Sequence, residues 1–182
     1  MSDFLRCYDY VNQPYARVRD ALIANPNYVF RHATAADTTQ AARLHVRLLG
    51  ALDVGAEVTI YITGVADDSA YGRVATKIGL MWEATNHPNV FPSLTGTLAI
   101  FALSPTETQL ELEARYAPPG GIAGQAFDAA VGHKLAEASV NTFVKEVAGW
   151  LREELATRNA ESAIEELTSA VPDRSVAPGA RP

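Results

Sequence analysis

The sequence has a single cysteine, Cys7, and this scarcity excludes two kinds of stabilising chemistry. One thiol cannot form an intramolecular disulfide, and it offers no cysteine cluster for a metal. The four histidines are dispersed, and no two of them have metal-ligand spacing on one predicted element. We therefore expect no metal site and no cofactor. A lone thiol also fits a reducing cytoplasm, the expected location.

Runs of basic residues and long apolar runs are also missing. The chain has 15 Lys and Arg against 21 Asp and Glu, a net charge of -6, and its basic residues are scattered. Nucleic acid and anionic membrane surfaces are therefore not expected as partners, because both select clustered Lys and Arg. The sequence has no run of about 18 consecutive apolar residues, which a membrane-spanning helix needs. Residues 1–6 lack the apolar core of a signal peptide.

The residues that are present indicate one globular domain. With 182 residues, 48% of them apolar and 20% charged, the chain can bury a core without disulfides or metals. From Thr157 the composition shifts toward Glu, Ser, Pro and Gly. We predict a ligand-binding domain over residues 1–157 and a flexible C-terminal tail over 158–182.

The pattern of apolar residues predicts a sheet preceded by a short helix. A strand is expected over residues 5–11 and a helix over 15–22 that stops at Asn25-Pro26. Residues 31–40 are expected to form a loop with room for one helical turn. Alternation then predicts strands over 44–48, 58–63, 74–84, 94–103 and 109–116, with hairpin turns at 53–56 and 66–69. In the last strand Leu110, Leu112 and Tyr116 alternate with Glu111 and Glu113, which indicates one dry and one wet face.

A long amphipathic helix follows the Pro-Pro-Gly-Gly segment at 118–121. At about 100° per residue, one side of it collects Leu135, Ala136, Ser139, Val140, Phe143, Val147 and Trp150. The fold class is therefore α+β, with a curved antiparallel six-stranded sheet wrapped around the C-terminal helix. A twisted sheet cannot meet one helix evenly along its length. The mismatch leaves either extra packed side chains or an apolar cavity.

The candidate ligand-binding residues are those that face this interior. They are Val58, Ile60, Ile62, Ile78, Leu80, Trp82, Leu98, Ile100, Leu110, Leu112, Tyr116, Leu135, Ser139 and Phe143. Trp82, Tyr116 and Ser139 each add one polar atom to an apolar wall, which suits an amphipathic ligand. The alternative is that these side chains fill the core, with Ser139 bonded to its own helix backbone.

No residue is a candidate for catalysis. Asp128 and His133 are about 140° apart on a helix and form no dyad. Glu111 and Glu113 are expected on the wet face, and Cys7 has no base beside it.

Three segments carry a resemblance to a known family: residues 10–14 (YVNQP) with Val18, residues 82–92 (WEATNHPNVFP), and residues 110–120 (LELEARYAPPG). Over residues 3–156 the chain resembles the START-like, or Bet v 1-like (SRPBCC), helix-grip superfamily, in particular its bacterial polyketide cyclase/dehydrase and coenzyme Q-binding-like branch. The resemblance implies a helix-grip fold holding a lipid, sterol, polyketide, quinone or similar apolar molecule. No catalytic residue of the cyclases matches this chain. The glycine-rich loop of the plant allergens is missing between the second and third strands.

Three functions follow from these observations. The first hypothesis is a carrier or sensor that holds a hydrophobic small molecule in an internal cavity. The second is an enzyme that resembles the polyketide cyclases and aromatases. The third is an interaction module that docks on a protein partner, not identified by the sequence. A short helix with Ile164 and Leu167 in the C-terminal extension could serve as the contact.

Overall fold

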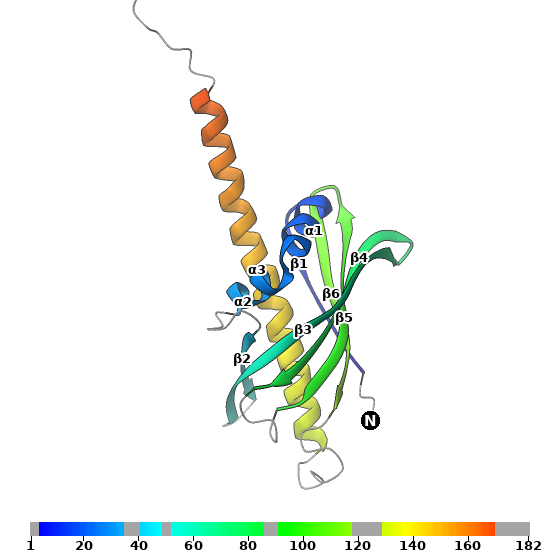
Figure 1. The fold of residues 1–182 in the computed structure, drawn as a ribbon. Coiled ribbons are helices and arrows are strands. Elements are labelled where there is room, and N and C mark those ends of the chain that lie inside the picture. The colour runs from blue at the N-terminus through cyan, green and yellow to red at the C-terminus, as the bar shows by residue number, and fades with distance from the viewer. Residues whose placement is uncertain (1–3, 35–40, 49–51, 86–90, 118–128, 170–182) are drawn as a thin grey trace, which may run out of the picture.

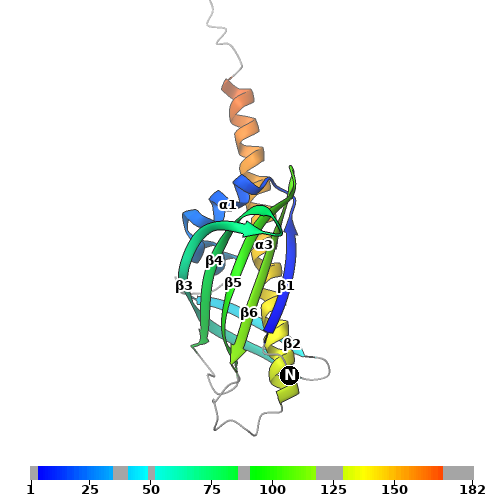
Figure 2. The same cartoon turned by 90° about the vertical axis from the view of Figure 1, so that its right-hand side faces the viewer.

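The computed structural model describes residues 4–34, 41–48, 52–85, 91–117 and 129–169, which form one antiparallel sheet and three helices (Figures 1 and 2). The strands are β1 (Phe4–Val11), β2 (Ala41–Leu48), β3 (Leu52–Ala70), β4 (Arg73–Ala84), β5 (Ser93–Ser104) and β6 (Glu107–Ala117). The helices are α1 (Tyr15–Ala24), α2 (Pro26–Ala33) and α3 (Ala129–Ser169).

The six strands are ordered β1-β6-β5-β4-β3-β2, and every neighbouring pair is antiparallel. Strands β2 to β6 follow one another along the sheet, whereas β1 pairs with the last strand. The sheet curls so far that α3 packs against both edge strands, β1 and β2. The predicted α+β helix-grip architecture is confirmed.

The two predicted hairpin turns are wrong, because both lie inside the long strand β3. A bulge between Ile62 and Gly64 breaks the alternation of β3, and this break hid the continuation of the strand over residues 66–69. The turn to β4 lies at Tyr71 and Gly72, with φ of 53° and 73°. Two positive φ values in a row are typical of a tight type I′ hairpin turn. The connection from β2 to β3 lies outside the described residues.

Helix α2 was not predicted from the sequence. Asn25 was interpreted only as the end of α1, but it also caps the next helix: its Oδ1 accepts a hydrogen bond from the Tyr28 N–H at 3.0 Å. Pro26 follows at the first helical position, where a missing N–H costs nothing. The predicted loop over 31–40 therefore starts too early, since α2 runs to Ala33; residues 35–40 lie outside the described residues.

The predicted flexible tail is helical over its first part, because α3 continues to Ser169. This stretch is rich in Ala and Glu, which are strong helix formers. An i,i+4 ion pair between Glu154 and Arg158, 2.8 Å long, supports the helix just before it projects beyond the body of the molecule. Residues 170–182 lie outside the described residues.

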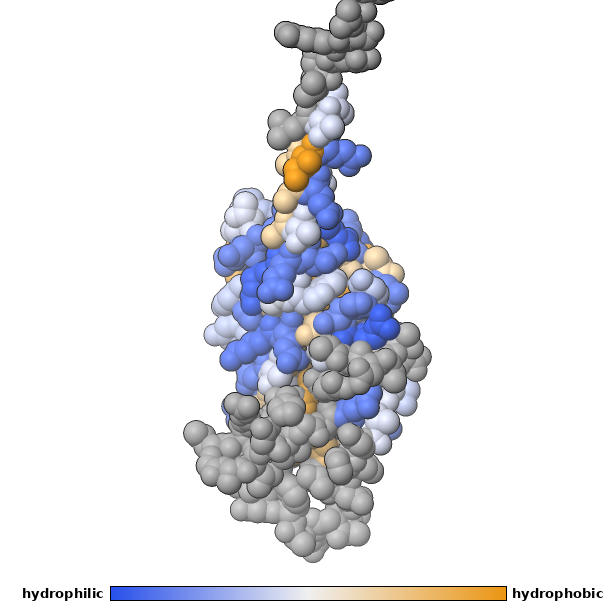
Figure 3. Space-filling model, turned by 90° about the vertical axis from the view of Figure 1, so that its left-hand side faces the viewer, coloured by the Kyte–Doolittle hydropathy of each residue, from blue (hydrophilic) through white to orange (hydrophobic). Residues whose placement is uncertain are grey.

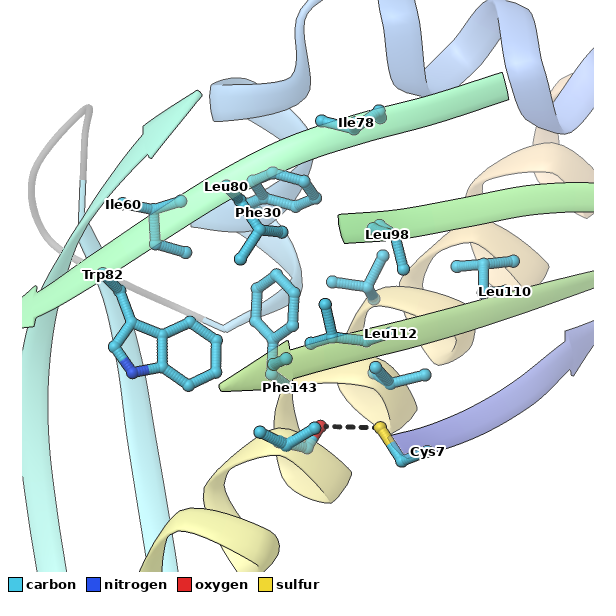
Figure 4. Packing of buried hydrophobic residues seen from close by; sticks show 14 of the residues in the cluster. Cys7, Phe30, Ile60, Ile78, Leu80, Trp82, Leu98, Leu110, Leu112 and Phe143 are labelled. Carbon is cyan, nitrogen blue, oxygen red and sulfur yellow. Dashed lines mark hydrogen bonds between the residues drawn. The ribbon is translucent and has the colours of Figure 1, made fainter. Parts of the chain in front are cut away.

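The core fills the space between the concave face of the sheet and α3 (Figure 4). Phe143 of α3 lies at its centre, with its ring centroid 5.2 Å from that of Phe30 on α2 and 5.5 Å from that of Trp82 on β4. Both contacts are edge-to-face, an arrangement that aromatic pairs favour. The centre of the interior is thus occupied by three interlocked aromatic side chains.

Glu146 of α3 has a partly buried carboxyl group with a raised pKa. Its Oε2 is buried with no hydrogen-bond partner among the described residues, and burial raises the pKa of its carboxyl from 4.5 to about 7. Between pH 4.5 and about pH 7, Glu146 is therefore mostly protonated in the folded protein and mostly ionised in the unfolded chain.

We expect the free energy of unfolding to fall as the pH rises from about 4.5 to about 7. After a discount for the partial exposure of Glu146, the fall should be about 1–2 kcal/mol. Urea unfolding across this pH range measures it. The variant E146Q should lose this slope, while E153Q, which alters an exposed carboxylate of the same helix, should keep it. An unchanged slope in E146Q would contradict the assignment.

Candidate functional site

The strand register brings four buried side chains into one row on the concave face. Ile60 lies opposite Trp82, Trp82 opposite Leu94, and Leu94 opposite Tyr116, across β3, β4, β5 and β6. His133 of α3 reaches the end of this row, with its ring centroid 5.6 Å from that of Tyr116. We call these five residues the polar end of the interior, because three of them carry a polar ring atom or hydroxyl.

Two nitrogens at the polar end have no hydrogen-bond partner among the described residues: Nε1 of Trp82 and Nδ1 of His133. The side chain of Trp82 is fully buried, and Figure 4 shows its six-membered ring toward Phe143 and its nitrogen on the opposite edge. Buried polar atoms in proteins almost always have a partner. An unpaired one costs about 1–3 kcal/mol, so an acceptor for the Trp82 N–H is to be expected.

Two further polar side chains of the interior, Ser139 and Cys7, contact backbone carbonyl oxygens of α3. The Ser139 hydroxyl donates to the Leu135 carbonyl oxygen at 2.6 Å, which is the core-filling alternative weighed from the sequence. The Cys7 thiol lies 3.4 Å from the Val140 carbonyl oxygen, and burial raises its pKa to about 12. A thiol with so high a pKa is not a nucleophile near neutral pH.

All the predicted ligand-binding residues lie in one interior. Every one of them is buried except Ile62, which is half-buried and packs against the same core. The structure therefore brings the predicted set together. That these residues line a ligand-binding cavity stays a prediction.

A depression of about 150 Å³ opens beside the polar end, between the edge strand β1 and α3. It is lined by Phe4, Leu5, Arg6, Cys7, His133, Glu137, Val140 and Asn141. Leu5, Cys7 and Val140 belong to the core, so side chains of the interior form part of the lining of this depression. Small-molecule sites usually have about 300–1,000 Å³, and a ligand entering here would have to displace side chains.

The sequence did not reveal the contact of His133 with Tyr116 or the burial of Glu111. Glu111 was predicted on the wet face; it is on the convex side of the sheet, but only 4% of it is exposed. Arg6 at 2.9 Å, Tyr71 at 2.8 Å and Gln109 at 3.0 Å donate hydrogen bonds to its carboxylate and cover it. Arg6 and Tyr71 are far from Glu111 in the sequence, and an alternating pattern carries no signal for such covering.

Within the described part of the chain, no three His, Cys, Asp or Glu side chains gather closely enough to hold a metal ion. None of the described helices combines the length and hydropathy needed to cross a bilayer.

No protein-family model matches this chain, and no curated protein matches it. Solved structures that are similar to it include the following three. TTHA0849 from Thermus thermophilus is 16% identical with a TM-score of 0.45, over 81% of this chain and 96% of that one. Ara h 8.0201 is 8% identical with a TM-score of 0.44, over 81% of this chain and 96% of that one. The Zhui aromatase/cyclase from a Streptomyces species is 14% identical with a TM-score of 0.45, over 84% of this chain and 94% of that one. The assignment of the fold rests on the strand order and on the position of α3.

Proposed function

We propose, from the premise that this chain has the START-like, or Bet v 1-like, helix-grip fold, that it binds an apolar small molecule at the polar end of the interior. The ligand carries a hydrogen-bond acceptor, as lipids, polyketides and quinones do, and the protein acts as its carrier or sensor. One observation carries this proposal: the buried N–H of Trp82 has no acceptor among the described residues.

The energetics favour a ligand that is mostly apolar. Each buried CH₂ contributes about 0.8 kcal/mol, against an association cost of about 4–15 kcal/mol. A molecule of about ten carbons or more therefore binds usefully without an ion pair. A hydrogen bond from the Trp82 N–H adds about 0.5–1.5 kcal/mol and orients the molecule.

The packing of the core supports a ligand position beside Tyr116 and His133 rather than at the centre. Phe143, Phe30 and Trp82 already fill the centre. The depression between β1 and α3 reaches the core next to His133, and β1 is an edge strand that pairs only with β6. An outward movement of the side chains of β1 and α3 that line the depression would join it to the polar end.

Two matched ligands and two matched variants test the proposal by calorimetric titration. Acetylnaphthalene has a carbonyl acceptor, whereas ethylnaphthalene has nearly the same shape without one. We expect the protein to bind acetylnaphthalene about two- to tenfold more tightly. The variant W82F should lose this preference, because phenylalanine has no N–H, and W150F should keep it.

Failure of both naphthalenes to bind, or an undiminished preference in W82F, would refute the proposed site. Trp150 is the matched control because it lies 17 residues beyond His133 in α3, about 25 Å further along the helix. Its ring lies beside Tyr28 and His32.

A second candidate function, a cyclase-type enzyme, is favoured by the contact between His133 and Tyr116. An imidazole beside a phenol at an apolar site can transfer a proton to or from a bound carbonyl compound. Incubation with a short poly-β-ketone, followed by chromatography, tests for cyclised products. If the protein is an enzyme, H133Q should reduce product formation by about 100-fold or more while ligand affinity is kept. Without turnover by the wild-type protein, only the carrier or sensor function stands.

A further inference from the structure

The last turns of α3, residues 156–169, project beyond the body of the molecule, and we call them the extension (Figures 1 and 2). Their described side chains are exposed except that of Asn159, and Ile164 is 63% exposed. Figure 3 shows hydrophobic side chains reaching the surface of this projecting helix. A helix of this length is marginal in water without packing. The extension therefore presents a face without a partner in the described part of the chain.

A groove of about 340 Å³ lies at the base of the extension, between α1, α2 and α3, and we call it the basal groove. Its lining residues are Arg17, Asp20, Ala21, Ala24, Asn25, Tyr28, Val29, Trp150, Leu155 and Arg158. Tyr28 and Trp150 form an aromatic wall, with ring centroids 6.1 Å apart. The groove thus combines apolar and aromatic surface with two arginines.

The charges of the groove and of the extension are opposite. After Arg158 the extension carries Glu161, Glu165 and Glu166 and no Lys or Arg. In the groove, Arg17 forms no ion pair with another described residue. Arg158 pairs with Glu154, yet half of its side chain stays exposed. Asp20 is engaged by Arg19 at 3.4 Å. The groove therefore offers two guanidinium groups to an acidic helix.

The acidic residues and the groove also lie on the same face of α3. At about 100° per residue, Trp150, Glu154, Arg158, Glu161 and Glu165 fall within an arc of about 80°. A two-fold symmetric pair of molecules needs this arrangement, because each molecule must present both halves of the contact on one surface. Ile164 lies next to this arc, on the side of Trp150.

We propose that two copies of this chain pair antiparallel through this face, so that the extension of each lies in the basal groove of the other. Glu161 and Glu165 of one copy then meet Arg17 and Arg158 of the other. With Arg158 level with Glu161 across the two-fold axis, Ile164 of one copy lies about 7.5 Å along the helix from Trp150 of the other. Both residues are on the same side of the contact, so Ile164 packs next to the aromatic wall. The interface is distinct from the ligand site and does not depend on it.

Sedimentation velocity at low ionic strength tests this pairing with two charge-reversed variants. R17E/R158E makes the groove acidic against an acidic extension, and E161R/E165R makes the extension basic against a basic groove. Each variant alone should be monomeric, with dimerisation at least tenfold weaker than in the wild-type protein. An equimolar mixture should dimerise again, because each extension then meets a groove of opposite charge. No rearrangement within one chain can produce this rescue in the mixture.

The control E153R/E166R reverses two acidic residues outside the arc and should remain dimeric. Circular dichroism verifies that all variants keep their helices, and I164D, which changes no groove residue, provides an independent disruption. A wild-type protein that is monomeric would overturn the proposal, and the groove and the extension would then serve another protein. A mixture of the two variants that stays monomeric would overturn it as well. Raised salt should weaken the dimer.

Discussion

Replacing Phe143 by alanine is expected to lower the free energy of unfolding by about 3–5 kcal/mol. Phe143 is fully buried, and its ring contacts those of both Phe30 and Trp82. These partners come from α2 and β4, so removal of the ring opens a cavity where three elements meet. The surrounding side chains can close such a cavity only in part, and the cost therefore includes the lost contacts on every side.

Urea unfolding with linear extrapolation measures this change. The matched control is F4A, because Phe4 is the same residue type at an edge strand and 47% of it is exposed. F4A should cost less than about 1 kcal/mol. Equal losses in F143A and F4A would mean that the aromatic centre of the interior is not packed as described.

The second large effect is expected from Gly96, where β5 approaches β6 closely. A Cβ added at Gly96 would lie 2.6 Å from the carbonyl oxygen of Glu113 and 2.8 Å from the Cβ of Ala114. Both neighbours belong to β6, and Gly96 lies directly opposite Ala114 in the register. The new methyl group can therefore be accommodated only if the paired strands separate.

We expect G96A to lower the free energy of unfolding by about 2–3 kcal/mol, the cost typical of overpacking. G64A is the matched control, since a Cβ at Gly64 would meet no heavy atom within 4 Å. At that position alanine should be neutral or slightly stabilising, because it restricts the unfolded chain. Calorimetric unfolding of both variants separates the steric effect from glycine's conformational freedom. A neutral G96A would show that β5 and β6 are further apart than described.

The faces of the main elements could be predicted from the sequence because burial imposes a period on each of them. Leu112 and Tyr116 were placed on the dry face of β6 by alternation, and Phe143 on the buried side of α3 by helical periodicity. These residues do face one interior. Periodicity works here because each element buries one face only, so the pattern and the packing have the same cause.

The features that were missed depend on local irregularities. The bulge near Gly64 shifts the alternation of β3, so Asp67 and Asp68 appeared to be a turn. In the structure they are strand residues that pair with Arg19 at 2.9 Å and Lys77 at 2.6 Å. Glu and Ser in the last turns of α3 indicated a tail, although Ala and Glu also favour a helix.

The candidate site could be predicted only in its apolar part. Trp82 and Tyr116 were recognised as residues that add a polar atom to an apolar wall. The strand register puts both in one row, which the sequence pattern did not predict. The contact of His133 with Tyr116 joins α3 to β6, and no periodicity within either element encodes it. Long-range contacts of this kind follow from how the sheet curves, which the sequence pattern does not specify.

The indole N–H resonance of Trp82 in a proton–nitrogen correlation spectrum tests the ligand site most directly. The chain has 2 Trp residues, so the second indole signal, from Trp150, is an internal control. On addition of acetylnaphthalene, the Trp82 signal should move downfield as its N–H gains an acceptor, while the Trp150 signal stays in place. A Trp82 signal that does not move at saturating ligand would contradict binding at the polar end of the interior.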